Sequence, residues 1–262
     1  MKAFMDKNPE GVVLFYDSEF GTPQGYFDVF DIDTTRIVHV PVTDLEELKF
    51  DMVAQLKEIE TDDKVFIMVD SVGNLASKKE VDDAESQKSA ADMTRAKQFK
   101  SLFRMITPHL TMKDIPMVAI NHTYDSQGLY PTKVVSGGTG MYYSADTIWI
   151  VGRQQDKVGT EIQGYHFVIN VEKSRFVKEK SKIPISVSWE KGVDKFSGLL
   201  DMAMDYGVIS RSGGWYQMVD VESGEVSDKK FREKDTHNSE FWQPILEDVK
   251  FDEFISKKFR VG

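Results

Sequence analysis

Five apolar residues and a carboxylate form the stretch Val65-Phe66-Ile67-Met68-Val69-Asp70, and Ser71 follows directly. An unbroken apolar run predicts a strand that is covered on both faces, as in a parallel α/β sheet. Ligands of open α/β sheets bind outside the carboxyl ends of the strands, so Asp70 is expected at the mouth of a site. A carboxylate there suits the water shell of Mg²⁺. A core strand that ends in a turn aspartate has the same pattern, and this stretch alone leaves both readings open.

Other apolar runs predict that the sheet continues on both sides of this strand. Gly11-Val12-Val13-Leu14-Phe15-Tyr16 is a second buried strand, and it brings Asp17-Ser18-Glu19 to the edge where Asp70 is expected. Asn121-His122 follows a further apolar run in the same way. Three shorter strands are expected in this sheet, at residues 36–40, 115–120 and 147–151. Two acidic strand ends therefore converge at one edge.

Two amphipathic helices are expected to cover the sheet. The first follows a capping box, Thr43-Asp44-Leu45-Glu46, and carries apolar residues at helical spacing up to Ile59. The second runs from Ala90 to Ile106, and its outward face is basic, with Arg95, Lys97, Lys100 and Arg104. Between them, the polar segment 78–89 is predicted to be a mobile loop. A long stretch up to Ser144 contains Lys133 and Ser136-Gly137-Gly138-Thr139-Gly140, and loops of this length inside a compact domain are usually functional or disordered.

The second half of the chain shows a different periodicity. Apolar residues alternate with polar or smaller ones over 165–171 and 183–189, which predicts antiparallel strands at a sheet edge. A helix is expected from Ser197 to about Gly207, and Ser212-Gly213-Gly214-Trp215-Tyr216 reads as a turn into a small appended module. We therefore expect one large α/β domain over residues 1–196 and a small α+β module over 197–262.

Composition limits the class of protein. The chain has 262 residues, of which 40% are hydrophobic and 29% charged, and these are globular values. It has no cysteine, hence no disulfide and no thiolate zinc site, which suits a reducing cytoplasm. Neither a signal peptide nor a run long enough to span a membrane is present in the sequence, so a cytoplasmic protein without a membrane partner is expected. A net charge of −10 means that nucleic acid would have to bind in a local groove.

Taken together, these motifs resemble the RecA family of strand-exchange recombinases, including its bacteriophage members, over nearly the whole chain. The resemblance is carried in order by Phe15-Tyr16-Asp17-Ser18-Glu19, Val69-Asp70-Ser71, Ala119-Ile120-Asn121-His122, the Gly137-Gly138 loop, Val171-Glu172-Lys173-Ser174-Arg175 and Gly213-Gly214-Trp215-Tyr216. It implies a RecA-like P-loop NTPase core, with a mostly parallel sheet, antiparallel edge strands and helices on both faces. It also implies a homo-oligomeric filament that uses ATP and Mg²⁺ on single-stranded DNA and exchanges strands with double-stranded DNA, in the host cytoplasm if the chain is phage-encoded.

The resemblance also implies roles for single residues. Glu19 matches the carboxylate that activates the attacking water, Asp70 the acid that holds Mg²⁺ through water, and Ser71 its small neighbour. His122 matches a polar sensor of the γ-phosphate, and Lys173 and Arg175 match a pair that reaches the ATP site of the adjacent subunit. Candidate DNA contacts are Arg95, Lys97, Lys100, Arg104, Lys133, Gly137 and Gly138, in and beside loops at about 77–92 and 123–144. The alternatives are a solvated turn glutamate, a structural histidine, and a basic hairpin and helix face that merely contact water.

One family motif is absent from these 262 residues. Phosphate cradling needs Gly-x-x-x-x-Gly-Lys-[Ser/Thr], and no such pattern occurs. We expect that segment upstream of Met1, because residues 1–10 match the end of the helix that it opens. Three explanations fit the absence of this motif: a truncated reading frame, a split gene with a P-loop-bearing partner polypeptide, and a protein that has abandoned hydrolysis. The expected function is ATP-dependent recombination and repair by a chain that is completed by a P-loop. One alternative is a non-hydrolysing DNA-binding or filament-modulating protein. The other is a helicase motor, which is less compatible with the Gly213-Gly214-Trp215-Tyr216 module. Alone, the chain is expected to be poorly soluble or to dimerise.

Overall fold

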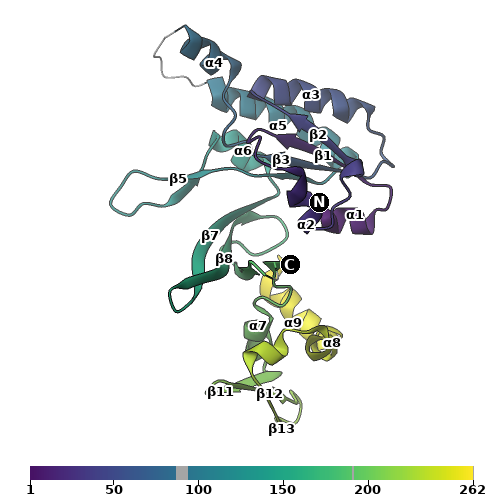
Figure 1. Cartoon of the computed structure of the whole chain (residues 1–262), viewed down its shortest axis with the longest axis vertical. Helices are drawn as coiled ribbons and strands as arrows, with labels where there is room; N and C mark the ends of the chain where they lie inside the picture. Colours follow the sequence, from purple (N-terminus) through teal and green to yellow (C-terminus); the bar gives the residue numbers. More distant parts are fainter. Residues whose placement is uncertain (87–93, 191, 262) are drawn as a thin grey trace. The chain divides into compact units, whose positions relative to one another are not determined.

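The computed structural model describes residues 1–86, 94–190 and 192–261, and these form two compact units, Met1–Ala145 and Asp146–Gly262 (Figure 1). The first unit is built on a four-stranded sheet with the order β2-β1-β3-β4. All its strands run parallel. Their bounds are Val12–Asp17 for β1, Ile37–Pro41 for β2, Val65–Asp70 for β3 and Met117–Ala119 for β4. The predicted buried parallel sheet is confirmed, although the strand expected at 147–151 does not join it.

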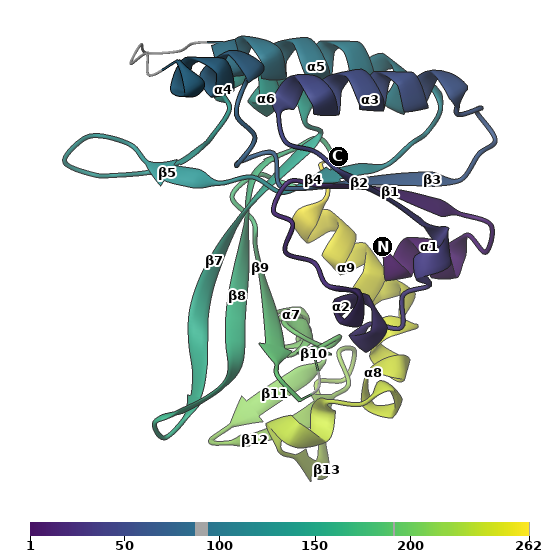
Figure 2. The same cartoon turned by 45° about the horizontal axis from the view of Figure 1, so that its top comes forward.

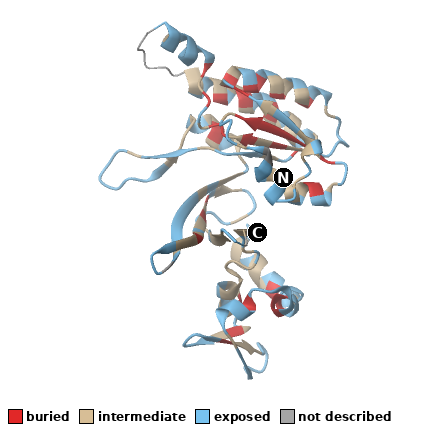
Figure 3. Ribbon diagram, viewed as in Figure 1, coloured by how far each residue is buried: buried red, intermediate tan, exposed pale blue. Residues whose placement is uncertain are grey.

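Helices cover both faces of the parallel sheet. Figure 2 shows α3 and α5 on one face and α1 and α2 on the other. Strand residues alternate between the two layers: Leu14 and Ile67 pack in the cluster with α3 and α5, whereas Val13 and Phe15 pack against α1 and α2. The bounds of these helices are Lys2–Lys7 for α1, Gln24–Val29 for α2, Leu45–Glu58 for α3 and Thr94–Met112 for α5, and a short 3₁₀ turn η1 spans Thr34–Arg36. The buried residues concentrate in the strands and the inner sides of the helices (Figure 3).

Two local expectations differ from the structure around these helices. The N-cap of α3 is Asp44 and not Thr43, and its carboxylate accepts from the Glu47 amide at 2.8 Å, so the cap lies one residue later than predicted. Glu47 in turn accepts from the Thr43 amide. Residues Lys78–Glu85 form helix α4 and not a loop, because Ser77 caps the helix through the Glu80 amide at 3.2 Å. The rest of the expected loop and the predicted start of the second helix, 87–93, lie outside the described residues.

The long stretch before Ser144 is also ordered into elements. It contains the antiparallel hairpin β5 (Thr123–Asp125) and β6 (Lys133–Val135), and then helix α6 (Gly138–Ser144). Gly137 and Gly138 have φ angles of +95° and +78°, a left-handed conformation that favours glycine at the start of α6. The segment expected as an unstructured loop therefore presents a hairpin and a helix start.

The second unit contains two antiparallel sheets. The first has the order β10-β9-β8-β7, with β7 at Thr147–Val158, β8 at Glu161–Ser174, β9 at Lys182–Ser188 and β10 at Gly192–Val193. The predicted antiparallel pairing is confirmed, but these strands form a sheet of their own and not the edge of the parallel one. A tight turn joins β7 to β8, and the two strands pair along nearly their whole length.

The C-terminal part of this unit has its own hydrophobic cluster. Helix α7 (Leu199–Tyr206) precedes the meander β11 (Ile209–Ser212), β12 (Trp215–Val219) and β13 (Val226–Phe231), and η2 (Glu233–Thr236), α8 (Ser239–Leu246) and α9 (Val249–Phe259) follow. Phe241, Trp242 and Phe251 are buried in this cluster. The turn predicted at 212–216 is the β11–β12 connection. No described helix is long and apolar enough to cross a membrane.

Candidate functional site

Two acidic residues occupy neighbouring positions where β1 and β3 end. The parallel register pairs Asp17 with Asp70, so both strands deliver their last residue to the same edge of the sheet. Asp17 is 1% exposed, Asp70 is half-buried, and Glu19 is exposed just beyond β1. The prediction that Glu19 and Asp70 share one edge is confirmed. A solvent-accessible acid beside a partly buried one is an arrangement that a ligand can reach.

Asp17 fixes the turn that carries Glu19. Its Oδ1 accepts hydrogen bonds from the amides of Glu19 at 3.0 Å and Phe20 at 2.9 Å. Its Oδ2 lies 3.1 Å from Nε2 of His39, which stacks on the Phe15 ring. Both oxygens of a buried carboxylate are thus satisfied, as burial requires. Asp17 was expected at this edge without a role, because an acid two residues before Glu19 can belong to a turn as well as to a site.

Ser18 and Ser71 join the two strand ends directly. The Ser18 hydroxyl donates to the Ser71 carbonyl at 2.6 Å and accepts from the Ser71 amide at 3.0 Å. The Ser18 amide donates to the Asp70 carbonyl at 2.9 Å. The Ser71 side chain, 1% exposed, donates to Oε1 of Glu19 at 2.7 Å. The peptide bond between Asp70 and Ser71 is cis. Ser71 therefore links the end of β3 to the Glu19 carboxylate.

Asn74 and His122 extend this network to the end of β4. The Asn74 amide nitrogen donates to Oε1 of Glu19, and Nε2 of His122 donates to the Asn74 Oδ1 at 3.0 Å. His122 lies against Gly73, where an added Cβ would stand 2.2 Å from the imidazole Cδ2. A glycine is needed at this close approach. Asn74 was missed by the sequence analysis, since a single amide in a loop carries no pattern; only its place between Asp70 and the next helix could have marked it.

Electrostatics at this edge raise the pKa of Asp70. Burial is the main cause, and the carboxylates of Glu19 and Asp17 add to it, while His122 opposes them. A buried acid beside two others is the usual setting for a raised pKa.

No group of three or more His, Cys, Asp or Glu able to hold a metal occurs within the described part of the chain. A single carboxylate of this kind fits a divalent cation that keeps its own water shell.

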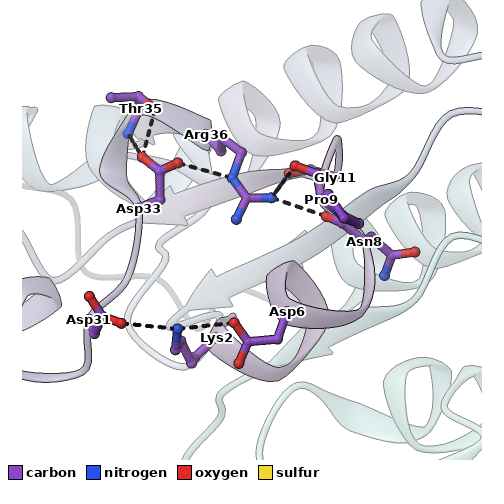
Figure 4. Close-up of polar contacts among 9 residues, drawn as sticks. All are labelled: Lys2, Asp6, Asn8, Pro9, Gly11, Asp31, Asp33, Thr35 and Arg36. Carbon is purple, nitrogen blue, oxygen red and sulfur yellow. Dashed lines mark hydrogen bonds and ion pairs between the residues drawn. The ribbon is translucent and has the colours of Figure 1, made fainter.

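A separate cavity of about 240 Å³ lies near the start of the chain. Its two cations are already paired: Lys2 contacts Asp6 at 3.0 Å and Asp31 at 3.3 Å. Arg36 contacts Asp33 at 3.2 Å and donates to the carbonyls of Asn8, Pro9 and Gly11 (Figure 4). These contacts tie the end of α1 to the turn before β2. The residues of this cavity are not those of the acidic strand ends.

Comparisons with known proteins agree over the C-terminal part and over the whole chain. Residues 196–255 match the family described as bacteriophage T4 recombination and repair protein, C-terminal domain. The chain is 48% identical to the recombination and repair protein of Enterobacteria phage T4 over 267 residues, covering 100% of this chain and 68% of that protein. It is also 26% identical to protein RecA of Mycoplasma mycoides, covering 82% of this chain and 62% of that one. The chain belongs to the RecA family of recombinases. It is a UvsX-like member, and it spans about two thirds of these relatives.

The candidate DNA contacts of this RecA-family chain lie mainly on α5 and in the hairpin that follows β4. Lys97, Lys100 and Arg104 are exposed on α5. Lys133 is exposed on β6 and pairs with Asp125 at 2.9 Å. Arg95 differs from expectation: it is half-buried and not outward, because its guanidinium donates to main-chain carbonyls of the segment after β3. Helical periodicity predicted Arg95 on the outer face of the helix, because periodicity within one helix contains no information about carbonyl acceptors from another segment.

The two predicted basic residues of the RecA-family motif at 171–175 lie in the second unit. Lys173 is a half-buried residue near the end of β8. Arg175 follows the strand, and its guanidinium contacts the Asp146 carboxylate at 3.1 Å. Both side chains of that ion pair are more than half exposed, at 64% and 61%, so the pair contributes little to stability. The assignment of Lys173 and Arg175 to a neighbouring ATP site stays a prediction.

Proposed function

We propose that this chain is part of an ATP-dependent DNA recombination and repair protein that exchanges strands on single-stranded DNA. The observation that carries the proposal is the shared edge at which Ser71 and Asn74 hold the Glu19 carboxylate beside Asp70. The phosphate-binding loop would come from a segment outside these 262 residues, whose sequence contains no Gly-x-x-x-x-Gly-Lys-[Ser/Thr]. The protein would act in the cytoplasm, that of the host cell for a phage-encoded chain.

The chemistry assigned to the edge follows from the positions of its acids. Glu19 is exposed and held by two donors on Oε1, so its other oxygen is directed to activate or orient a water molecule. Asp70 would hold Mg²⁺ through water, with Ser71 as its small neighbour. ATP and Mg²⁺ supply the phosphoryl group and the charge that neutralises it. The residues of this chain orient the water and keep the acids in register.

His122 is proposed as the sensor that relates the nucleotide to the DNA-binding segment. It contacts Asn74, and its carbonyl accepts from the Ser136 amide at 3.0 Å, just before Gly137. A shift of the imidazole is therefore transmitted to the start of α6 through one main-chain hydrogen bond. DNA phosphates would be contacted by Lys97, Lys100, Arg104 and Lys133 and by the amides at Gly137 and Gly138. Binding is expected with single-stranded DNA first and with double-stranded DNA during exchange.

A homo-oligomeric filament is proposed as the working assembly. Lys173 and Arg175 would act in trans, their charges neutralising the transferred phosphoryl group of the adjacent subunit. Such a role requires Arg175 to exchange its exposed contact with Asp146 for a phosphate, which costs little because the ion pair is solvated. Residues 1–196 are proposed as the ATPase core and 197–262 as the small C-terminal module, in line with the separate hydrophobic cluster of that module.

The free edge of β4 is where we propose that a P-loop-bearing segment adds to the sheet. Among the described strands β4 pairs with β3 alone, and Val118 and Ile120 on and just after it are 49% and 39% exposed. Strands of parallel sheets are normally buried, and an exposed apolar edge favours the addition of a strand. The fold would then be a RecA-like P-loop NTPase core. Val118→Lys should block complementation while the 262-residue chain still folds.

The proposal is tested by adding back the missing loop. The chain is mixed with a polypeptide that carries the Gly-x-x-x-x-Gly-Lys-[Ser/Thr] segment of the phage T4 relative, and ATP hydrolysis is measured with and without single-stranded DNA. DNA-stimulated hydrolysis should appear and should fall at least a hundredfold in Glu19→Gln, whereas the exposed acid Glu58 on α3 provides the matched control Glu58→Gln. Hydrolysis that survives in Glu19→Gln would remove the assigned role.

We propose as the alternative a non-hydrolysing DNA-binding protein that modulates filaments of complete recombinase subunits. It predicts no hydrolysis in any complementation, but a changed assembly rate when the chain is added to a filament of the phage T4 relative. Light scattering during assembly, with and without ATP hydrolysis, distinguishes the two functions.

A further inference from the structure

Arg95, in the first turn of α5, contacts the main chain of the segment that follows β3. Its Nε donates to the Leu75 carbonyl at 2.7 Å, and its Nη2 donates to the carbonyls of Gly73 at 2.5 Å and Val72 at 3.3 Å. Nη1 lies 3.5 Å from the Ser136 hydroxyl. Charge-assisted hydrogen bonds of this kind are stronger than neutral ones, and a planar fork makes several of them at once. The guanidinium therefore holds three main-chain carbonyls of one loop.

The loop held by Arg95 is the one that carries Asn74. Val72 and Leu75 are buried on either side of it, whereas the Asn74 amide is exposed and lies between Glu19 and His122. The position of that amide depends on the path of the main chain from 72 to 75. Without the guanidinium, the carbonyls of this loop would need water as a replacement.

We propose that Arg95 is a positioning residue for the Glu19, Asn74 and His122 network, and not a contact to DNA phosphate. The chemical meaning of this role rests on the proposed function, because Glu19 is taken as the residue that activates water. Arg95 fixes the loop, the loop fixes the Asn74 amide, and the amide fixes one carboxylate oxygen of Glu19. Arg95 also attaches this loop to α5, so a displacement of the first turn of α5 would move the loop and the Asn74 amide at the acidic edge.

The contacts of Arg95 distinguish it from the cations beside it. Its guanidinium packs 5.2 Å from the Phe99 ring and uses Nε, Nη1 and Nη2 in contacts within the first unit. An arginine has five N–H donors in a fixed fork, and loop carbonyls already occupy Nε and Nη2, so a phosphate bound there would cost carbonyl partners and only Nη1 is left for a further acceptor. Lys97 and Lys100 are exposed on the same helix and have no such cost.

The first test uses hydrogen exchange in the full 262-residue chain. In Arg95→Lys and Arg95→Met, peptides over 71–77 and 119–123 should exchange about tenfold faster, because the loss of charged hydrogen bonds favours local opening. Peptides over α3 should not change. Lys97→Met, on the same helix, is the matched control and should leave both regions as in the wild type. Unchanged exchange over 71–77 in Arg95→Lys would overturn the positioning role.

A second measurement needs no variant and so remains informative if the substitutions fail to fold. In the wild-type chain, the Arg95 Nε–H proton should exchange with water about tenfold or more slowly relative to that of exposed Arg104, because it is bonded to the Leu75 carbonyl. Equal exchange of the two protons in the NMR spectrum contradicts the proposal.

A third arm separates this role from DNA binding and from the proposed function. The salt dependence of affinity for an oligothymidylate should keep its slope in Arg95→Lys and Arg95→Met, and lose about one unit in Lys97→Met if that lysine contacts phosphate. A slope reduced by about one in Arg95→Met would make Arg95 a phosphate contact and overturn the inference. Absence of hydrolysis in every complementation, with the exchange results intact, would instead remove the proposed function and leave the positioning role standing.

Discussion

The Ser71 hydroxyl and the Glu19 carboxylate, 52 residues apart in sequence, form a 2.7 Å hydrogen bond across the ends of two neighbouring parallel strands. The bond exists because β1 and β3 end in register, so each places its next residues at the same edge. Asn74 donates to the same carboxylate oxygen. The exposed acid is thereby held in one orientation by two neutral donors.

Asn74→Asp should convert one of these donors into a repelling charge. A second carboxylate beside Glu19 is expected to lower the free energy of unfolding by about 1–2 kcal/mol at neutral pH. Protonation should remove most of this loss near pH 4, where a carboxylic acid can donate again. Urea unfolding at both pH values checks it. Asn74→Ala, which loses the hydrogen bond without adding a charge, is the control and should show no such pH dependence.

Gly73→Ala should displace His122 from Asn74. The added Cβ would meet the imidazole Cδ2 at 2.2 Å, and the φ angle of Gly73 lies outside the left-handed range, so the cost comes from this contact alone. A destabilisation of about 1–3 kcal/mol is expected, as for overpacking. His122→Ala should relieve it in the double variant, and equal costs with and without the imidazole would refute the contact.

The control for that substitution lies in the same unit. An added Cβ at Gly25, in helix α2, meets nothing within 4 Å. Gly25→Ala is expected to be neutral or to stabilise by up to about 1 kcal/mol through helix propensity. Thermal melts of both glycine variants, run side by side, therefore separate a steric effect from a general effect of replacing glycine.

Asp70→Asn should stabilise the chain at neutral pH. The folded-state pKa of Asp70 is raised above its ordinary 3.8, first by burial and then by Glu19 and Asp17. The folded protein then holds a proton that the unfolded chain has lost, so stability falls as pH rises from 3.8 through the raised pKa. The variant removes this loss, and its gain in melting temperature should vanish below that window.

The exposed acid Asp62 provides the comparison for this pH series. Asp62→Asn should leave the melting temperature close to that of the wild type at every pH, since substitutions of exposed side chains usually have small effects. A melting temperature of Asp70→Asn that is equal to or below that of the wild type at neutral pH would show that burial and the neighbouring acids do not penalise an ionised Asp70.

Trp242 reports on the C-terminal cluster. It is 1% exposed and packs against Phe196 and Phe241, yet its indole nitrogen has no hydrogen-bond partner within the described residues. Trp242→Phe should therefore cost less than about 1.5 kcal/mol, because it removes an unsatisfied donor along with apolar area. Trp242→Ala should cost about 3–5 kcal/mol. Chemical denaturation followed by circular dichroism measures both, and similar losses would mean that the indole nitrogen is satisfied.

The sequence was sufficient for the strands and their shared edge, and insufficient where a contact depends on another segment. Val65–Asp70 and Val12–Asp17 are continuous apolar runs, and buried parallel strands are the elements that produce such runs. Helix α4 has no apolar stripe and begins at a single serine cap, so its pattern resembles a loop. Arg95 lies on the outer side of α5 by periodicity, and only the fold brings carbonyls to it.

Arg95 binds three carbonyl oxygens, and a carbonyl is present whatever side chain its residue carries. The arginine therefore responds to the course of the backbone and not to the amino acids along it. Substitutions within the loop that preserve the course of its backbone leave the hydrogen bonds to Arg95 intact. The loop beside the acidic edge can therefore change its side chains, and so the shape and polarity that it presents to a ligand, while Arg95 keeps the backbone in place.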